Sequence, residues 1–297
     1  MSADSGLSGL TLYTQAAQSA ASRVIDEYST SFGTATRLLP PGTRAAIRSI
    51  YSLVRVADEI VDGTAEEAGL DADSRREVLD TLETETISAM GTGFSSNLIV
   101  HAFASAARAA DVEKALVQAF FRSMRRDLEP VHSLSEEQYR RYVHGSAEAV
   151  GLMCLRVFLQ DTAPTTDQMA QLETGAARLG AAFQKINFLR DLHEDAEQLG
   201  RAYFPGAVPG ELSEARKIEI LADIEADLGA ARRAIPLLPP GARRATDLAT
   251  RLFEEVSARL RHTSVAELKR RRVSVPRRVR LQLLLQVLLP VVRGGRR

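Results

Sequence analysis

Two acidic motifs lie more than a hundred residues apart in this chain, and each contains a pair of aspartates four residues apart. The first motif runs from Arg55 to Asp62 and includes Asp58, and the second includes Asp191 and Asp195. On a helix, this spacing places both carboxylates on one face, roughly 6 Å apart. Like charges this close repel each other, and carboxylate oxygens are the ligands that hard divalent cations such as Mg²⁺ prefer. The spacing therefore predicts metal binding at both motifs.

The residues around the first motif indicate a buried helix. Apolar side chains flank the acids on nearly every side and leave only a narrow polar stripe, which is the pattern of a helix inside a protein. A buried carboxylate must be paired or must bind a metal ion. The first motif alone leaves two interpretations open, a metal site and a structural ion pair between Arg55 and Asp58.

The second motif favours the metal site. Asn187, Asp191 and Asp195 follow one another at intervals of four residues, and Gln184 lies about one turn earlier. An amide with two carboxylates is an all-oxygen ligand set, which suits Mg²⁺ and does not suit zinc. Two such faces in one chain are difficult to explain as solvated helix surfaces.

Arginines accompany both motifs. Arg55 lies one turn before the first aspartate pair, Arg190 lies within the second motif, and Arg201 and Tyr203 follow it closely. A guanidinium group binds phosphate in a bidentate manner that lysine cannot match, and Mg²⁺ in proteins is often shared with substrate phosphates. Together, the two motifs predict a site that holds a diphosphate between metal ions.

Most of the chain is predicted to be helical. Apolar residues recur at spacings of three and four, Ala, Leu, Arg and Glu are abundant, and no alternating run of strand type occurs. A capping-box pattern from Ser135 to Gln138 marks one helix start. The predicted helices are 16–37, 43–62, 74–90, 97–110, 112–128, 135–160, 166–199, 213–234, 241–262 and 276–292. Because no linker is long or low in complexity, we expect residues 1–297 to form a single all-α domain with residues 1–12 as a flexible N-terminus.

Composition narrows the function classes. A chain of 297 residues with 45% apolar residues can bury one large core. Its 38 basic and 38 acidic residues balance, so no global field attracts nucleic acid and we expect no nucleic-acid partner. Cys154 is the single cysteine, and the N-terminus lacks the basic and apolar regions of a signal peptide. These features, with no long uninterrupted apolar run, predict a cytoplasmic protein.

Residues 268–297 differ in charge from the rest of the chain. From Leu268 onward there are ten basic residues and no acidic residue, with leucines and valines between the basic clusters. Basic flanks around an apolar helix are typical of contact with an anionic membrane surface. The segment therefore allows peripheral contact with the inner membrane face, and a final core helix with a solvated basic tail is the alternative.

Four parts of the chain are similar to those of a known family. They are Tyr28 to Phe32 with Leu38 to Pro40, Arg55 to Asp62, Tyr142 to Gly151, and Gln184 to Asp195 with Gly200 to Pro205. In these parts the chain resembles the phytoene synthase and squalene synthase family, the head-to-head prenyl synthases, and the bacterial phytoene synthases in particular. Glu59 stands where many members have aspartate, and Glu148 stands where a small residue is usual. If Glu148 points inward, it would narrow or polarise the prenyl channel.

The resemblance implies the isoprenoid synthase fold, a single helical bundle around a central cavity, and it implies roles for individual residues. The residues that would bind metal are Asp58, Asp62, Asn187, Asp191 and Asp195, and those that would bind diphosphate are Ser29, Tyr51, Arg55, Gln184, Arg190 and Arg201. Phe32 and Ala147 would line a prenyl pocket, and the four aspartates with Tyr142 and Tyr203 would be catalytic. The final proton would pass to diphosphate itself or to one of these tyrosines. The implied cofactor is Mg²⁺, with Mn²⁺ as an alternative and without NADPH.

The implied reaction is a Mg²⁺-dependent condensation of two geranylgeranyl diphosphates, through a cyclopropyl diphosphate intermediate, to phytoene in carotenoid biosynthesis. The alternative is a squalene or dehydrosqualene synthase that acts on farnesyl diphosphate. A head-to-tail prenyl elongase or a terpene cyclase would share the helical fold, but the spacing of Gln184 to Asp191 and the Gly200 to Tyr203 segment argue against both. A non-enzymatic helical scaffold would leave the two acidic faces unexplained.

Overall fold

All regular secondary structure in the described part of the chain is helical. The computed structural model describes residues 8–129, 134–192, 203–205 and 212–288, and no β-strand occurs in these ranges. In chain order the elements are α1 (Gly9–Tyr28), α2 (Thr30–Thr36), α3 (Pro41–Val61), α4 (Thr64–Glu67), α5 (Ala72–Thr92), α6 (Leu98–Ala109), α7 (Lys114–Asp127), α8 (Glu136–Val143), the π-helix η1 (His144–Glu148), α9 (Ala149–Leu159), α10 (Thr166–Arg190), α12 (Glu214–Ala234), the 3₁₀-helix η2 (Ile235–Leu237), α13 (Pro240–His262), α14 (Val265–Leu268) and α15 (Arg277–Leu288). The predicted all-α class is confirmed.

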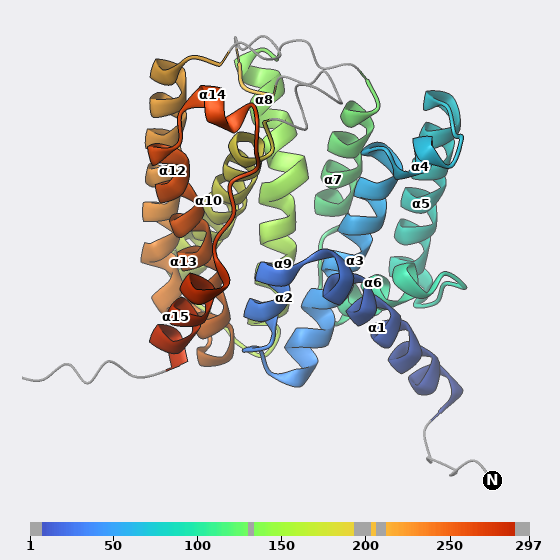
Figure 1. The fold of residues 1–297 in the computed structure, drawn as a ribbon. Coiled ribbons are helices and arrows are strands. Elements are labelled where there is room, and N and C mark those ends of the chain that lie inside the picture. Colours follow the sequence, from blue (N-terminus) through green and yellow to red (C-terminus); the bar gives the residue numbers. More distant parts are fainter. Residues whose placement is uncertain (1–7, 130–133, 193–202, 206–211, 289–297) are drawn as a thin grey trace, which may run out of the picture.

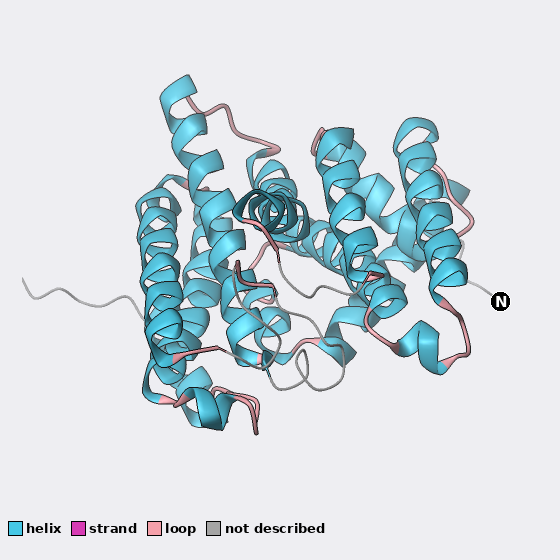
Figure 2. Ribbon diagram, turned by 90° about the horizontal axis from the view of Figure 1, so that it is seen from above, coloured by secondary structure: helices cyan, strands magenta, loops and turns pink. Residues whose placement is uncertain are grey.

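The helices form a bundle with three parts (Figure 1). Helices α3, α5, α6 and α7 stand on one side, α10, α12 and α13 stand on the other, and α8 and α9 run between them. The view from above shows helices joined by loops throughout the described part of the chain (Figure 2). None of the helices in the described ranges has both the length and the hydropathy needed to cross a bilayer.

Capping side chains set several helix boundaries. The predicted capping box is confirmed at the start of α8, where Ser135 and Gln138 each accept a backbone N–H from the other. Thr165 and Gln168 form the same arrangement at the start of α10. Helix α5 is capped at its C-terminal end by Gly93, whose φ of 84° lies in the left-handed region that favours glycine.

Three boundaries differ from those predicted. The predicted helix 16–37 is divided at Ser29, whose backbone is extended and whose hydroxyl caps α2 by accepting the N–H of Phe32 at 3.2 Å. Helix α1 begins at Gly9, so the N-terminal segment expected to be flexible is helical from that residue onward. The predicted helix 166–199 contains α10, which ends at Arg190, and residues 193–200 lie outside the described residues.

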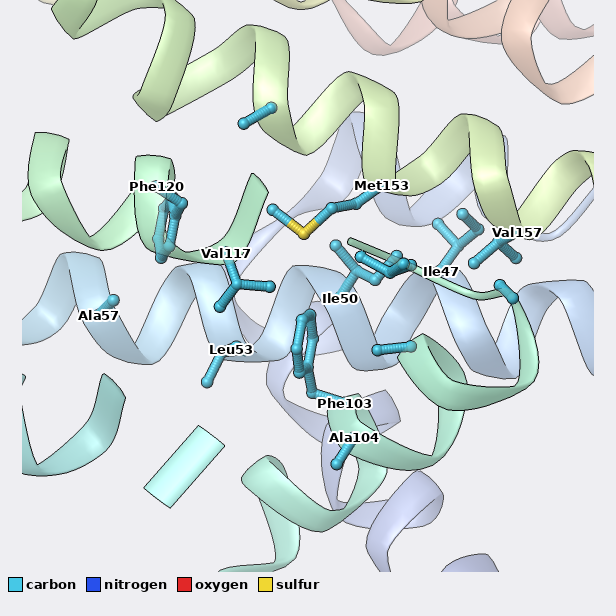
Figure 3. Close-up of a cluster of buried hydrophobic side chains, with 14 of the residues drawn as sticks. Ile47, Ile50, Leu53, Ala57, Phe103, Ala104, Val117, Phe120, Met153 and Val157 are labelled. Carbon is cyan, nitrogen blue, oxygen red and sulfur yellow. The ribbon is translucent and has the colours of Figure 1, made fainter. Parts of the chain in front are cut away.

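Helix α3 is central to one part of the core. Its buried Ile47, Ile50, Leu53 and Ala57 recur every three or four residues, which places them on one face of the helix. This face meets side chains of α6, α7 and α9, among them Phe103 of α6, in the cluster drawn in Figure 3. The apolar packing on this face holds α3 in place while its polar stripe carries the first acidic motif.

Two glycines, Gly145 within the π-helix η1 and Gly180 of α10, allow close helix packing. A Cβ atom at Gly145 would overlap the carbonyl oxygen of Ala119 on α7 and the hydroxyl of Ser123. In the same way, a Cβ atom at Gly180 of α10 would overlap the carbonyl oxygen of Ala147. Backbone therefore packs against backbone on both sides of η1, between α7 and α10.

We predict that Gly145→Ala destabilises the protein. Because the added methyl group would displace backbone atoms, we expect the loss in free energy of unfolding to lie at the upper end of about 1–3 kcal/mol. This loss exceeds the gain of about 1 kcal/mol in helix propensity when alanine replaces glycine. Gly229→Ala in α12 is the matched control, since the nearest atom to its Cβ would be a guanidinium nitrogen 3.9 Å away. Urea unfolding should show a loss of stability for the first variant and no loss for the control; equal behaviour would contradict the tight packing.

Candidate active site

The first acidic motif lies at the C-terminal end of α3. Asp58 is in the last turn, and Asp62 is the C-cap, whose N–H donates to the carbonyl oxygen of Asp58 at 2.8 Å. The C-terminal end of a helix carries roughly half a negative charge, and the last turn of α3 contains no basic residue. The two carboxylates thus lie where additional negative charge is unfavourable, and a bound cation would compensate for it.

The charge on Asp58 is opposed by its surroundings. Burial raises the pKa of its carboxyl well above the usual range, and the charge of Asp62 raises it further. Arg55 acts in the opposite direction, and Asp127 and Glu59 add to the rise. The guanidinium group of Arg55 forms its ion pair with Glu59. The structural ion pair that the sequence left open for Arg55 is therefore made with Glu59, and not with Asp58.

Predicted substrate-binding residues of the N-terminal segment lie next to this helix. The ring of Phe32 stacks on that of Tyr51, with centroids 5.7 Å apart. Burial raises the pKa of Tyr51, while Arg55 and the nearby side chain of Ser29 act in the opposite direction. Arg55 lies over the ring of Tyr28, 4.4 Å from its centroid. The structure therefore brings the predicted residues of α2 and α3 together beside the first motif.

The second acidic motif ends α10 much as the first ends α3. Asp191 is the C-cap, and its N–H donates to the carbonyl oxygen of Asn187 at 2.8 Å. The helix thus ends earlier than predicted, and Asp191 is its cap instead of an internal residue. The side-chain oxygen of Asn187 is buried and accepts no hydrogen bond from any described residue. Since buried polar atoms are normally satisfied, this oxygen is expected to face a ligand or a cation.

Two arginines neutralise Asp191. Arg190 donates from Nε to Oδ1 at 2.9 Å and from Nη2 to Oδ2 at 2.6 Å. Arg272, from the segment between α14 and α15, places its Nε 2.8 Å from Oδ1. Sequence analysis placed Arg272 only in the basic C-terminal segment, because no local signal relates two residues 81 positions apart. Part of that segment therefore belongs to the site.

An aromatic cluster connects the two motifs. Tyr142 of α8 stacks on Tyr203 with centroids 5.1 Å apart, and Tyr203 stacks on Phe188 of α10 at 4.2 Å. Both tyrosine hydroxyls donate to Asp127, Tyr142 at 2.9 Å and Tyr203 at 3.2 Å. Burial raises the pKa of Tyr142 well above its ordinary value, and the charges of Asp127 and Asp62 add to this effect. Tyr142 therefore remains protonated, within electrostatic reach of the first motif.

Asp127 is a candidate site residue whose role the sequence left open. It follows two arginines, so an approach to the cavity and a surface ion-pair cluster explain it equally well. In the structure, Arg125 instead pairs with Asp80 of α5 at 2.6 Å, and Asp127 is only 6% exposed. Phe120 and Met124, seven and three residues earlier, are also buried. This helical period of buried residues was the signal that could have found it.

Two of the remaining predicted residues lie in the described part of the chain, and two do not. Gln184 lies on α10 one turn before Asn187, and Ala147 lies in η1 with its carbonyl oxygen against Gly180. Asp195 and Arg201 lie outside the described residues. Within the residues that are described, no three His, Cys, Asp or Glu side chains are close enough to form a complete metal site.

The donor atoms nevertheless suit a hard divalent cation. All of those at the two helix ends are carboxylate or amide oxygens, the ligands that Mg²⁺ and Mn²⁺ accept. The unpartnered oxygen of Asn187 and the opposed charge of Asp58 would both be compensated by such an ion. The residues therefore fit the cofactor that the sequence predicts.

Comparison with known proteins gives a consistent result. The family model of squalene/phytoene synthase matches residues 25–279. A 15-cis-phytoene synthase of Paracoccus sp. (strain N81106 / MBIC 01143) is 28% identical over 276 residues, which cover 88% of this chain and 87% of that protein. A presqualene diphosphate synthase of Zymomonas mobilis is 33% identical over 181 residues, which cover 60% of this chain and 56% of that protein.

A solved structure shows the same fold. The crystal structure of a dehydrosqualene synthase in complex with a ligand superposes with a TM-score of 0.74 and 20% sequence identity, covering 94% of this chain and 98% of that one. The fold is thus the all-α isoprenoid synthase fold, with an acidic motif at the end of each of two helices. The chain belongs to the squalene/phytoene synthase family, whose members are prenyltransferases.

We predict that asparagine substitutions at the two motifs change stability differently. Asp58→Asn removes a charge that burial and Asp62 oppose, so the metal-free protein should gain stability, and about 1 kcal/mol would raise Tm by roughly 2–4 °C. Asp191→Asn removes the partner of two arginines and should lower Tm slightly or leave it unchanged. Calorimetry in EDTA measures both shifts. An equal rise in both variants would show that the two motifs do not differ electrostatically.

Proposed function

We propose that this protein joins two molecules of geranylgeranyl diphosphate head to head and forms phytoene, in carotenoid biosynthesis. The observation that carries the proposal is the convergence of two oxygen-rich helix ends on one aromatic cluster. Membership of the squalene/phytoene synthase family supports a head-to-head condensation. The similarity to the phytoene synthase of Paracoccus supports this product.

The acidic helix ends would hold the cofactor. Asp58 and Asp62 on α3, Asn187 and Asp191 at the end of α10, and Asp195 offer carboxylate and amide oxygens to Mg²⁺, with Mn²⁺ as the alternative. When bound, these ions supply positive charge that stabilises a departing diphosphate.

Guanidinium groups would take up the rest of the diphosphate charge. Arg55 and Arg190 lie beside the two motifs, and Arg201 follows the second in sequence. Arg272 would also contribute to diphosphate binding, because it forms an ion pair with Asp191. A substrate phosphate offers the same planar, bidentate pairing that Asp191 offers to Arg190. The arginines would therefore exchange from carboxylate to diphosphate when substrate binds.

The aromatic cluster would serve the carbocations. Loss of diphosphate leaves an allylic cation, the double bond of the second substrate attacks it, and loss of a proton from the resulting cation closes the ring of a cyclopropylcarbinyl diphosphate. A second ionisation, rearrangement and proton loss then give the conjugated triene. The rings of Tyr142, Tyr203 and Phe188 have π-faces that stabilise nearby positive charge. Since both tyrosines donate their O–H to Asp127, a tyrosine oxygen would accept the final proton as its own proton passes to the Asp127 carboxylate. Diphosphate is the alternative acceptor.

A squalene or dehydrosqualene synthase is the second candidate. The similarity to the presqualene diphosphate synthase of Zymomonas, at 33% identity, favours it. The two candidates share the diphosphate site and differ in the length of the prenyl chain and, for squalene, in a final reduction.

We predict that the purified protein with Mg²⁺ converts geranylgeranyl diphosphate to phytoene equally with and without NADPH. Proton loss to a tyrosine or to diphosphate needs no reductant, and EDTA should stop turnover because it removes the ion that the site requires. Mass spectrometry of the hydrocarbon measures the outcome. A strong preference for farnesyl diphosphate, or a saturated central bond formed only with NADPH, would assign the protein to the second candidate.

We predict that Asp127→Asn lowers kcat while KM changes little. Asp127 accepts both tyrosine hydroxyls and would orient them without touching diphosphate. Loss of its charge would therefore weaken stabilisation of the transition state and lower kcat roughly 10- to 100-fold. Glu83→Gln is the matched control. It removes a carboxylate of α5 that pairs with Arg125, which lies on α7 as Asp127 does. Steady-state kinetics of both variants tests the role. A similar loss in the control, or an unchanged kcat in Asp127→Asn, would contradict it.

A further inference from the structure

Helix α15 is apolar on two sides, and one of them is covered. Leu283, Leu284 and Val287 form the inner side and pack against a cluster of buried residues of α2 and α13. This inner contact attaches α15 to α13, which itself packs on α10.

The outer side of α15 exposes a leucine stripe. Leu281, Leu285 and Leu288 are 57%, 46% and 44% exposed, and their spacing of four and three residues places them on one helix face. Single exposed leucines are ordinary, whereas a contiguous stripe along a helix of 12 residues indicates an interaction surface.

Two arginines lie at the start of the helix that carries this stripe. Arg277 and Arg278 are exposed and form no ion pair with any described residue. The sequence from Leu268 onward contains no acid that could neutralise them. An apolar stripe with unneutralised arginines matches the two properties of an anionic lipid surface, its acyl region and its charged headgroups.

A second copy of the chain fits this surface less well. A twofold contact through the leucine stripe would cover the leucines, but it would bring no acid to Arg277 and Arg278, because α15 itself contains none. Anionic lipid covers the leucines and neutralises the arginines at the same time.

We propose that the outer face of α15 docks the protein on an anionic lipid surface through the leucine stripe and the arginines at its start. The functional value of this docking rests on the proposed function: a long hydrocarbon product is insoluble in water and has to pass into lipid. Docking through α15 would hold α13, on which α15 packs, at the membrane that receives the product.

Vesicle flotation with the full-length protein tests the docking. The wild type should float with phosphatidylglycerol vesicles at low salt, and float much less with phosphatidylcholine vesicles or at high salt. Replacement of Leu281, Leu285 and Leu288 by Gln should weaken binding roughly tenfold or more, since less apolar surface enters the lipid. The matched control replaces Leu10 and Leu12 of α1, each 57% exposed, by Gln and should bind as the wild type does.

A second pair of variants tests the charge. Arg277→Gln with Arg278→Gln should weaken binding to phosphatidylglycerol roughly tenfold or more, whereas Arg122→Gln with Arg140→Gln, exposed arginines of α7 and α8, should not. The proposal is overturned if the wild type does not float, if either control loses binding equally, or if sedimentation shows a dimer that the leucine variant abolishes. Flotation needs no turnover, so its result is independent of whether the protein forms phytoene.

Discussion

Negative charge held at the ends of two helices is the constraint on which the rest of this structure depends. Asp58 and Asp62 lie at the C-terminal end of α3, and Asp191 caps α10. Helix dipoles and the mutual repulsion of the aspartates oppose this arrangement, and burial opposes it at Asp58. It persists because the apolar face of α3, with Ile50 and Leu53, is packed into the core. The free energy gained from this packing offsets the unfavourable electrostatic energy of the acidic residues.

The two helix ends resolve the constraint differently. The acids of α3 have no basic residue in their last turn, and Arg55 is paired with Glu59. Asp191 is neutralised by Arg190 and Arg272. A cation that approaches Asp58 therefore relieves repulsion, whereas one that approaches Asp191 competes with two guanidinium groups. The same competition would release arginines next to an arriving diphosphate, so that metal and substrate would favour each other at the second motif.

Close packing around η1 positions the aromatic cluster between these ends. Gly145 lets α7 approach so closely that the hydroxyl of Ser123 donates to the carbonyl oxygen of Tyr142 at 3.1 Å. Asp127 is one turn further along α7 and accepts the Tyr142 hydroxyl. The distance between this carboxylate and the phenol thus depends on a residue without a side chain, and any shift of η1 would move the cluster relative to both motifs.

The sequence by itself determined what depends on neighbouring residues. Helical periodicity predicted an all-α chain, the pattern at Ser135 predicted a helix start, and the spacing of Asp58 and Asp62 placed both at the end of one helix. Contacts between distant residues were decided by the tertiary structure alone. Asp127 joins tyrosines from two other segments, and Arg272 reaches Asp191 across 81 positions. No local pattern encodes such contacts, because they exist only once packing has brought the helices together.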